Sequence, residues 1–114
     1  GVDVQVLRVF VDESGRFGNP LGVVLDAEDL GTERRQEIAA ELGFSETVFV
    51  DDVERAELRI FTPATELPLA GHPLVGTAWL LAQVTGRPPE VLRPALAAEV
   101  ATWSEDDTVW VRGR

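Results

Sequence analysis

The chain contains no cysteine, and this absence excludes several kinds of chemistry at once. Without a thiol there is no disulfide framework, no thiolate metal ligand and no cysteine nucleophile. A single histidine, without other ligands at metal-binding spacing, also disfavours a structural zinc site. Any catalysis therefore has to use carboxylate, hydroxyl or imidazole groups.

Basic residues are scarce as well, because the chain has 20 acidic and 10 basic residues and a formal net charge of −10. Phosphate backbones and anionic membrane surfaces are bound through Lys and Arg clusters, so we expect neither nucleic acid nor a membrane as a partner. No apolar stretch reaches the roughly 20 residues that a membrane span requires, and no secretion signal opens the chain. These absences favour a cytoplasmic protein.

The length of 114 residues suits one domain with one hydrophobic core. Runs of β-branched residues, bounded by polar or glycine-containing segments, predict most of it to be sheet. The alternation in the first run slips at Val6-Leu7, which is typical of a bulged or doubly buried strand. We expect hairpins between the third and fourth runs and between the last two. The expected strands are 2–11, 21–25, 47–50, 56–62, 96–103 and 108–112.

Two segments predict helices. In the first, Thr32 is a candidate cap, Gly43 marks the end, and apolar residues at helical spacing indicate an amphipathic outer helix. The second, from Leu74 to Thr85, is almost wholly apolar, so we expect a helix that is buried on all sides and stops at Gly86. Trp79 within it is most simply a core or interface residue.

One buried helix among six or more strands predicts the α+β class. The expected architecture is a single domain over residues 1–114, with a curled, barrel-like mixed sheet around the central helix.

Glu46 begins an apolar run, Thr47 to Val50, that favours burial in a strand. Partial burial disfavours the charged form of a carboxyl group and so suits it to exchange protons near neutral pH. The alternative is an exposed glutamate at a strand end, which is the more usual place for this residue.

His72 stands directly before the apolar helix, where free backbone N–H groups and the helix dipole favour an anion such as a substrate carboxylate. It is a candidate for binding that anion or relaying a proton, although His72 and Gly71 would equally suit a simple turn. Asn19, between Gly18 and Pro20, is a candidate for holding a substrate oxygen, but this tripeptide is also ordinary turn chemistry.

Taken in order, these motifs resemble the PhzF-like isomerase family of phenazine biosynthesis from about Val4 to the C-terminus. The segments that carry the resemblance are Gly18-Asn19-Pro20, Ser45-Glu46-Thr47-Val48-Phe49-Val50, Arg59-Ile60-Phe61-Thr62-Pro63, Glu66-Leu67-Pro68-Leu69-Ala70-Gly71-His72-Pro73 and Gly76-Thr77-Ala78.

The resemblance implies a fold like that of diaminopimelate epimerase and an isomerisation of a small carboxylated substrate. In this family Glu46 would match the acid/base that takes a proton from carbon and returns it elsewhere. Asn19, Ser45, Gly71 and His72 would match residues lining the substrate pocket. No cofactor and no metal are implied, and the cysteine pair of the related epimerases is absent.

Two departures from the family pattern matter. Leu74 stands where the family more often has a small or hydroxylated residue. Family members also carry two such domains with the site between them, and this chain resembles only the first.

Three interpretations follow from the missing half. A second copy of the chain completes the site in a homodimer, a separate polypeptide supplies the other half, or the domain is a non-catalytic binding or interaction module. We favour the homodimer, because a face that normally packs on a second domain would otherwise expose apolar surface.

Overall fold

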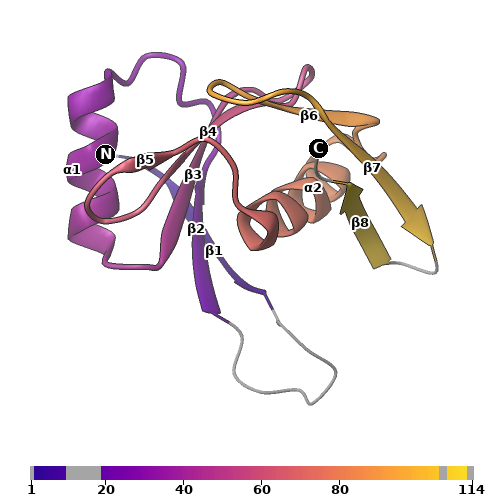
Figure 1. Ribbon diagram of the computed structural model, residues 1–114, viewed down its shortest axis with the longest axis horizontal. Helices are drawn as coiled ribbons and strands as arrows, with labels where there is room; N and C mark the ends of the chain where they lie inside the picture. The colour runs from indigo at the N-terminus through magenta and orange to yellow at the C-terminus, as the bar shows by residue number, and fades with distance from the viewer. Residues whose placement is uncertain (1, 10–18, 106–107, 113–114) are drawn as a thin grey trace.

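The computed structural model describes the backbone of residues 2–9, 19–105 and 108–112, and the side chains of residues 2–8 and 20–102. Its strands join one mixed sheet in the order β1-β2-β3-β4-β6-β7-β8, and the short β5 pairs with β4. Helix α1 covers one face of this sheet, and α2 lies between the other face and the β6–β8 segment (Figure 1). The elements are β1 Val4–Val9, β2 Asn19–Val24, α1 Thr32–Leu42, β3 Glu46–Asp52, β4 Glu57–Phe61, β5 Glu66–Leu67, α2 Gly71–Thr85, β6 Val91–Pro94, β7 Val100–Glu105 and β8 Thr108–Arg112.

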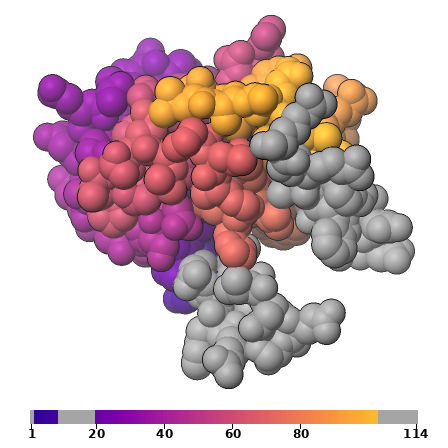
Figure 2. Space-filling view, in the orientation of Figure 1, coloured from indigo at the N-terminus to yellow at the C-terminus, as the bar shows by residue number. Residues whose placement is uncertain are grey.

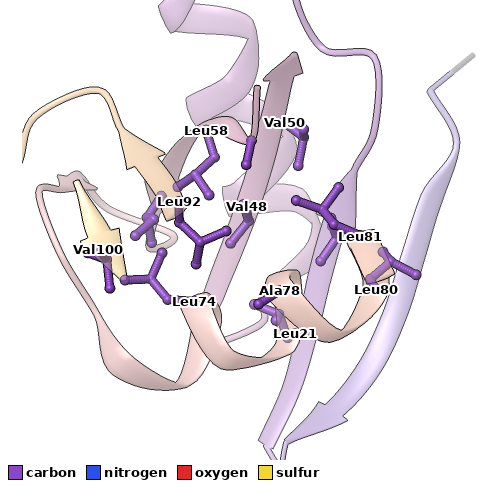
Figure 3. Packing of buried hydrophobic residues seen from close by; sticks show 13 residues of the cluster. Leu21, Val48, Val50, Leu58, Leu74, Ala78, Leu80, Leu81, Leu92 and Val100 are labelled. Carbon is purple, nitrogen blue, oxygen red and sulfur yellow. The ribbon is translucent and has the colours of Figure 1, made fainter. Parts of the chain in front are cut away.

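The central strands bury side chains on both faces of the sheet, because α1 covers one face and α2 covers the other. Successive residues of a strand point to opposite faces. Val48 and Val50 therefore pack with the cluster that contains Leu74, Ala78 and Leu81 of α2 (Figure 3). Phe49, between them, belongs to a second cluster with Ile38 and Ala39 of α1. The expected α+β class is confirmed.

Helix α1 ends as the sequence predicted. Gly43 adopts a left-handed conformation, with φ of 71°, and its N–H donates to Ala39 O, as is usual after the last turn of a helix. The start lies one residue earlier than expected, because Gly31 is the N-cap and Thr32 is already helical and makes no capping hydrogen bond. Arg35, on the inner face, is buried, which the pattern did not indicate.

Helix α2 is not buried on all sides, so that expectation is wrong. Leu74, Ala78 and Leu81 face the core, whereas Trp79 is 42% exposed. An apolar sequence excludes a polar face, but it does not determine whether the fold covers every side of the helix. Gly86 ends α2 in a left-handed conformation, as predicted.

The barrel-like part of the fold prediction is not supported, because the sheet is open. β1 and β8 are the two ends of the strand order, and no pairing joins them among the described residues. Both edge strands contact α2 instead. The helix therefore lies between two arms of a curled sheet.

Strand β1 is a regular edge strand rather than a bulged or doubly buried one. Its register against β2 runs without a shift from Val4 opposite Val24 to Val9 opposite Asn19, and Val6 is 53% exposed. Both predicted hairpins are present, β3 with β4 and β7 with β8, although β7 begins only at Val100. The polar, glycine-rich composition of residues 12–20 predicts a loop, but Asn19 and Pro20 already belong to β2, and residues 12–18 lie outside the described part of the chain. Residues 106–107, at the tip of the last hairpin, lie outside it as well. Neither described helix is both long enough and apolar enough to span a bilayer.

Candidate active site

The entry into β3 is positioned by Phe44, which follows the end of α1. Its ring lies against Gly22 of β2, where an added Cβ would come within 3.1 Å of the ring carbon Cδ2. Gly22 pairs with Thr47 in the parallel register between β2 and β3, and Leu21 pairs with Glu46. The close approach of Phe44 to a residue without a side chain therefore helps to place Glu46 at the start of its strand.

Glu46 is half-buried, as the apolar run behind it predicted. By strand alternation it lies on the same face as Val48 and Val50, which is the face that α2 covers. Its carboxylate makes no hydrogen bond or ion pair with any residue that the structure describes. By contrast, Asp51 near the other end of the same strand binds Arg35, with Arg35 Nη1 donating to Asp51 Oδ2 at 3.1 Å. Glu46 thus has a carboxylate without a hydrogen-bond or ion-pair partner among the described residues, at the edge of the hydrophobic core.

Two further candidates lie beside Glu46 in the backbone. Ser45 directly precedes it and is exposed. Asn19 is the first residue of β2 and stands two positions before Leu21, the parallel partner of Glu46. The backbones of Asn19 and Ser45 therefore belong to the same end of the β2–β3 pair. The side chain of Asn19 lies outside the described part of the chain.

Gly71 and His72 are the first two residues of α2, so the helix starts before the predicted Leu74 and His72 lies within it rather than ahead of it. Both residues are exposed. The N-cap is Ala70, which offers no side chain to satisfy the first N–H groups. Free N–H groups and the positive end of the helix dipole favour an anion at this place. The segment that begins α2, in red, reaches the surface in the middle of the face that Figure 2 shows.

His72 continues into an outward stripe along α2. Trp79 lies seven residues later and Gln83 a further turn on, so the three share one side of the helix. All three are exposed, and Trp79 is the large apolar member of the stripe. Leu69, just before the helix, is also 37% exposed.

One neighbour of Glu46 was not singled out from the sequence. Thr47 pairs with Phe61 across β3 and β4, so the next step of the antiparallel register places Thr62 opposite Glu46. Thr62 follows the end of β4 and begins the turn into β5. The Phe61-Thr62-Pro63 motif carried part of the signal, but only the register shows what it adjoins. No group of three or more potential metal ligands occurs within the ranges that the structure describes.

Comparison with known proteins agrees with these motifs. The family model described as phenazine biosynthesis-like protein, PhzC-PhzF, matches residues 7–102. The trans-2,3-dihydro-3-hydroxyanthranilate isomerase of Pseudomonas aeruginosa is 48% identical over 73 residues, which cover 61% of this chain and 26% of that protein.

Solved structures give the same answer for the fold. A phenazine biosynthesis protein of the PhzF family from Bacillus anthracis is similar with a TM-score of 0.73 and 30% identity, covering 96% of this chain and 39% of that one. A predicted epimerase from Pseudomonas aeruginosa gives a TM-score of 0.73 and 30% identity, covering 97% and 42%.

The chain therefore spans about a quarter to two fifths of the lengths of these relatives. Within that span the family model covers most of the chain, and the solved structures reproduce the arrangement of its sheet and helices. The chain belongs to the PhzC-PhzF family of phenazine biosynthesis-like proteins.

Proposed function

We propose that this chain carries the acid/base half of a cofactor-independent isomerase site. Glu46 takes a proton from a carbon atom of a small carboxylated substrate and returns it at another position. One carboxyl group suffices, because it accepts a proton from one carbon and donates a proton to another, and no electrons are exchanged with a second reactant. While the carboxyl group holds the proton, that proton exchanges with solvent, so deuterium from the solvent enters the product.

The observation that carries this proposal is the state of the Glu46 side chain. It is half-buried on the α2 face, and no described residue holds it by a hydrogen bond or ion pair. A carboxylate with only a structural role would be expected to have a partner, as Asp51 and Glu66 have in Arg35 and Arg59.

The substrate class rests on the helix start and on one relative's name. The first turn of α2, which contains Gly71 and His72, suits a carboxylate. Asn19, at the start of β2, and Ser45, just before β3, are proposed as further binding residues. The Pseudomonas relative is named as an isomerase of a hydroxylated dihydroanthranilate, which is itself a carboxylic acid. We take from that name the reaction class and a probe compound.

The wall opposite Glu46 is proposed to come from a second copy of this chain. The relatives are more than twice as long as this chain, so the part of them that this chain does not match is large enough for a second domain of similar size. The outward stripe of α2 provides the contact, because Trp79 within it and Leu69 just before the helix are exposed apolar side chains. A two-fold axis would bring the two stripes together and place two Glu46 residues in one cleft.

The test is solvent deuterium incorporation into trans-2,3-dihydro-3-hydroxyanthranilate, followed by NMR. Glu46→Gln should reduce incorporation by about a hundredfold or more, because general acid/base groups contribute about 10²–10⁴ in rate. Glu41→Gln is the matched control, since Glu41 is exposed on α1 and should leave the rate unchanged. Undiminished exchange in Glu46→Gln would remove Glu46 from this role. Binding of the probe without exchange in either protein would instead support a non-catalytic binding module.

A further inference from the structure

The turn between β4 and β5, residues 62–65, adjoins the proposed acid/base. Thr62 lies opposite Glu46 by continuation of the β3–β4 register. The start of β2 flanks Glu46 on the other side, through Leu21. Glu46 therefore lies between a strand start and this turn, and the position of the turn sets one side of the space around its carboxylate.

Thr62 organises the turn through its own polar groups. Its N–H donates to Thr65 O at 2.7 Å. Its hydroxyl oxygen accepts from the N–H groups of Ala64 at 3.1 Å and Thr65 at 3.0 Å, and the hydroxyl donates to Thr65 O. These bonds fix the internal shape of the turn, and none of them involves the carbonyl oxygen of Thr62.

The base of the turn is held by an ion pair between β4 and β5. Arg59 Nε and Nη2 donate to the two carboxylate oxygens of Glu66 at 2.8 and 2.6 Å. The hydrogen bond with Glu66 is the largest influence on Arg59 and raises its pKa, with burial opposing it, so the guanidinium keeps its charge. The pair fixes the two strands from which the turn begins and ends, but it does not contact the Thr62 carbonyl.

Gln36 of α1 holds the first residue of the turn, Thr62. Its Nε2 donates to Thr62 O at 2.8 Å, across a sequence separation of 26 residues. Gln36 is half-buried beside the buried Arg35 on the side of α1 that meets the sheet. Helix α1 covers the face of the sheet opposite to the one on which Glu46 lies. Gln36 therefore reaches the site only through the backbone of Thr62.

We propose that Gln36 is a positioning residue for the Glu46 site: by holding the Thr62 carbonyl, it keeps the 62–65 turn in register beside the carboxylate. This inference rests on the proposed function for its catalytic consequence. Small displacements of a positioned group lower the rate of a reaction steeply, so loss of this contact lowers the rate rather than only the stability.

The experiment compares three variants of the full chain. Gln36→Leu keeps the approximate size and removes the donor, and Gln36→Lys retains a nitrogen donor on a side chain that can reach the carbonyl. Gln5→Leu makes the same chemical change at an exposed residue of β1. We expect Gln36→Leu to lower the turnover number for deuterium incorporation about tenfold. Gln36→Lys should keep most of the wild-type turnover number, and Gln5→Leu should have the wild-type turnover number.

Amide hydrogen exchange supplies a readout of the contact itself. In Gln36→Leu the amides of Ala64 and Thr65 should exchange about three- to tenfold faster, the effect expected for loss of one hydrogen bond. The amides of α2 should be unchanged. Unaltered exchange at Ala64 and Thr65, or faster exchange there with a wild-type turnover number, would overturn the inference.

A different outcome separates this inference from the proposed function. Wild-type protein that incorporates no deuterium would refute the proposed function. The positioning of Glu46 is then decided by the ¹³C chemical shift of its side-chain carboxyl, which should move in Gln36→Leu and stay in Gln5→Leu. No movement in either variant would overturn the inference.

Discussion

Arg35 is the residue whose environment differs most from what its type suggests. Its side chain is 4% exposed, and its guanidinium binds the carboxylate of Asp51, with Nη2 and Oδ1 2.5 Å apart. Nε and Nη2 also donate to the carbonyls of Leu30 and Ala27, each at 2.8 Å. Arg35 thus joins α1, the loop before it and the end of β3.

Loss of this arginine should therefore destabilise the folded protein strongly. We expect Arg35→Leu to lower the free energy of unfolding by about 3–5 kcal/mol, because it leaves a partly buried carboxylate unpaired. Urea denaturation followed by circular dichroism measures the change. Arg34→Leu is the control, since Arg34 is half exposed in its ion pairs with Glu37 and Glu41, and such pairs are worth about 0–1 kcal/mol. Equal losses in the two variants would contradict the assigned role.

The contrast between Glu46 and Arg35 shows what could be predicted at single residues. Partial burial of Glu46 was predictable, because the evidence lay in the four residues that follow it. Arg35 was not, because its partner is 16 residues away and an arginine within a helix is usually exposed. The bond between Gln36 and Thr62 was missed for the same reason, since it depends on which helix face meets which strand end.

Helix ends were more predictable than helix faces or starts. Gly43 and Gly86 both adopt the left-handed conformation that a residue without a side chain reaches easily, so local sequence marks the stop. The cap at Thr32 was wrong by one residue, because Gly31 takes the extended conformation there. The bulge in β1 was also wrong, since an apparent phase slip in an edge strand can simply reflect exposed valines.

The two ends of α2 should respond in opposite directions to the same substitution. Gly86→Ala should lower the free energy of unfolding by about 1–2 kcal/mol, because φ there is 86° and a Cβ strains this conformation. Gly71→Ala should raise it by about 0.4–1 kcal/mol, because a Cβ at Gly71 meets nothing within 4 Å and alanine restricts the unfolded chain. Thermal unfolding measures both. Destabilisation by Gly71→Ala of the same size would show that the helix start is tighter than the structure indicates.

At the scale of the whole molecule, the fold class could be predicted from the sequence. Which faces of the sheet and of α2 are buried could not. The hydrophobic periodicities of strands and helices depend on residues close in sequence, and they correctly indicated an α+β fold with one apolar helix. Whether that sheet closes, and which side of α2 stays exposed, depends on contacts between distant elements. In this fold His72, Trp79 and Gln83 remain exposed along one side of α2.

The proposed homodimer makes that stripe an interface, which can be tested within one helix. Trp79 and Val84 are both exposed apolar residues of α2, 42% and 53%, but they lie about 140° apart around its axis. Trp79→Glu should give a monomer at micromolar concentration in sedimentation velocity, because a charge at the centre of an apolar contact would be buried without a partner. Val84→Glu should remain a dimer, and both should keep the wild-type circular dichroism spectrum. A wild-type protein that sediments as a stable monomer would contradict the homodimer and favour a separate second half, since the stripe would then lack the partner that completes the site.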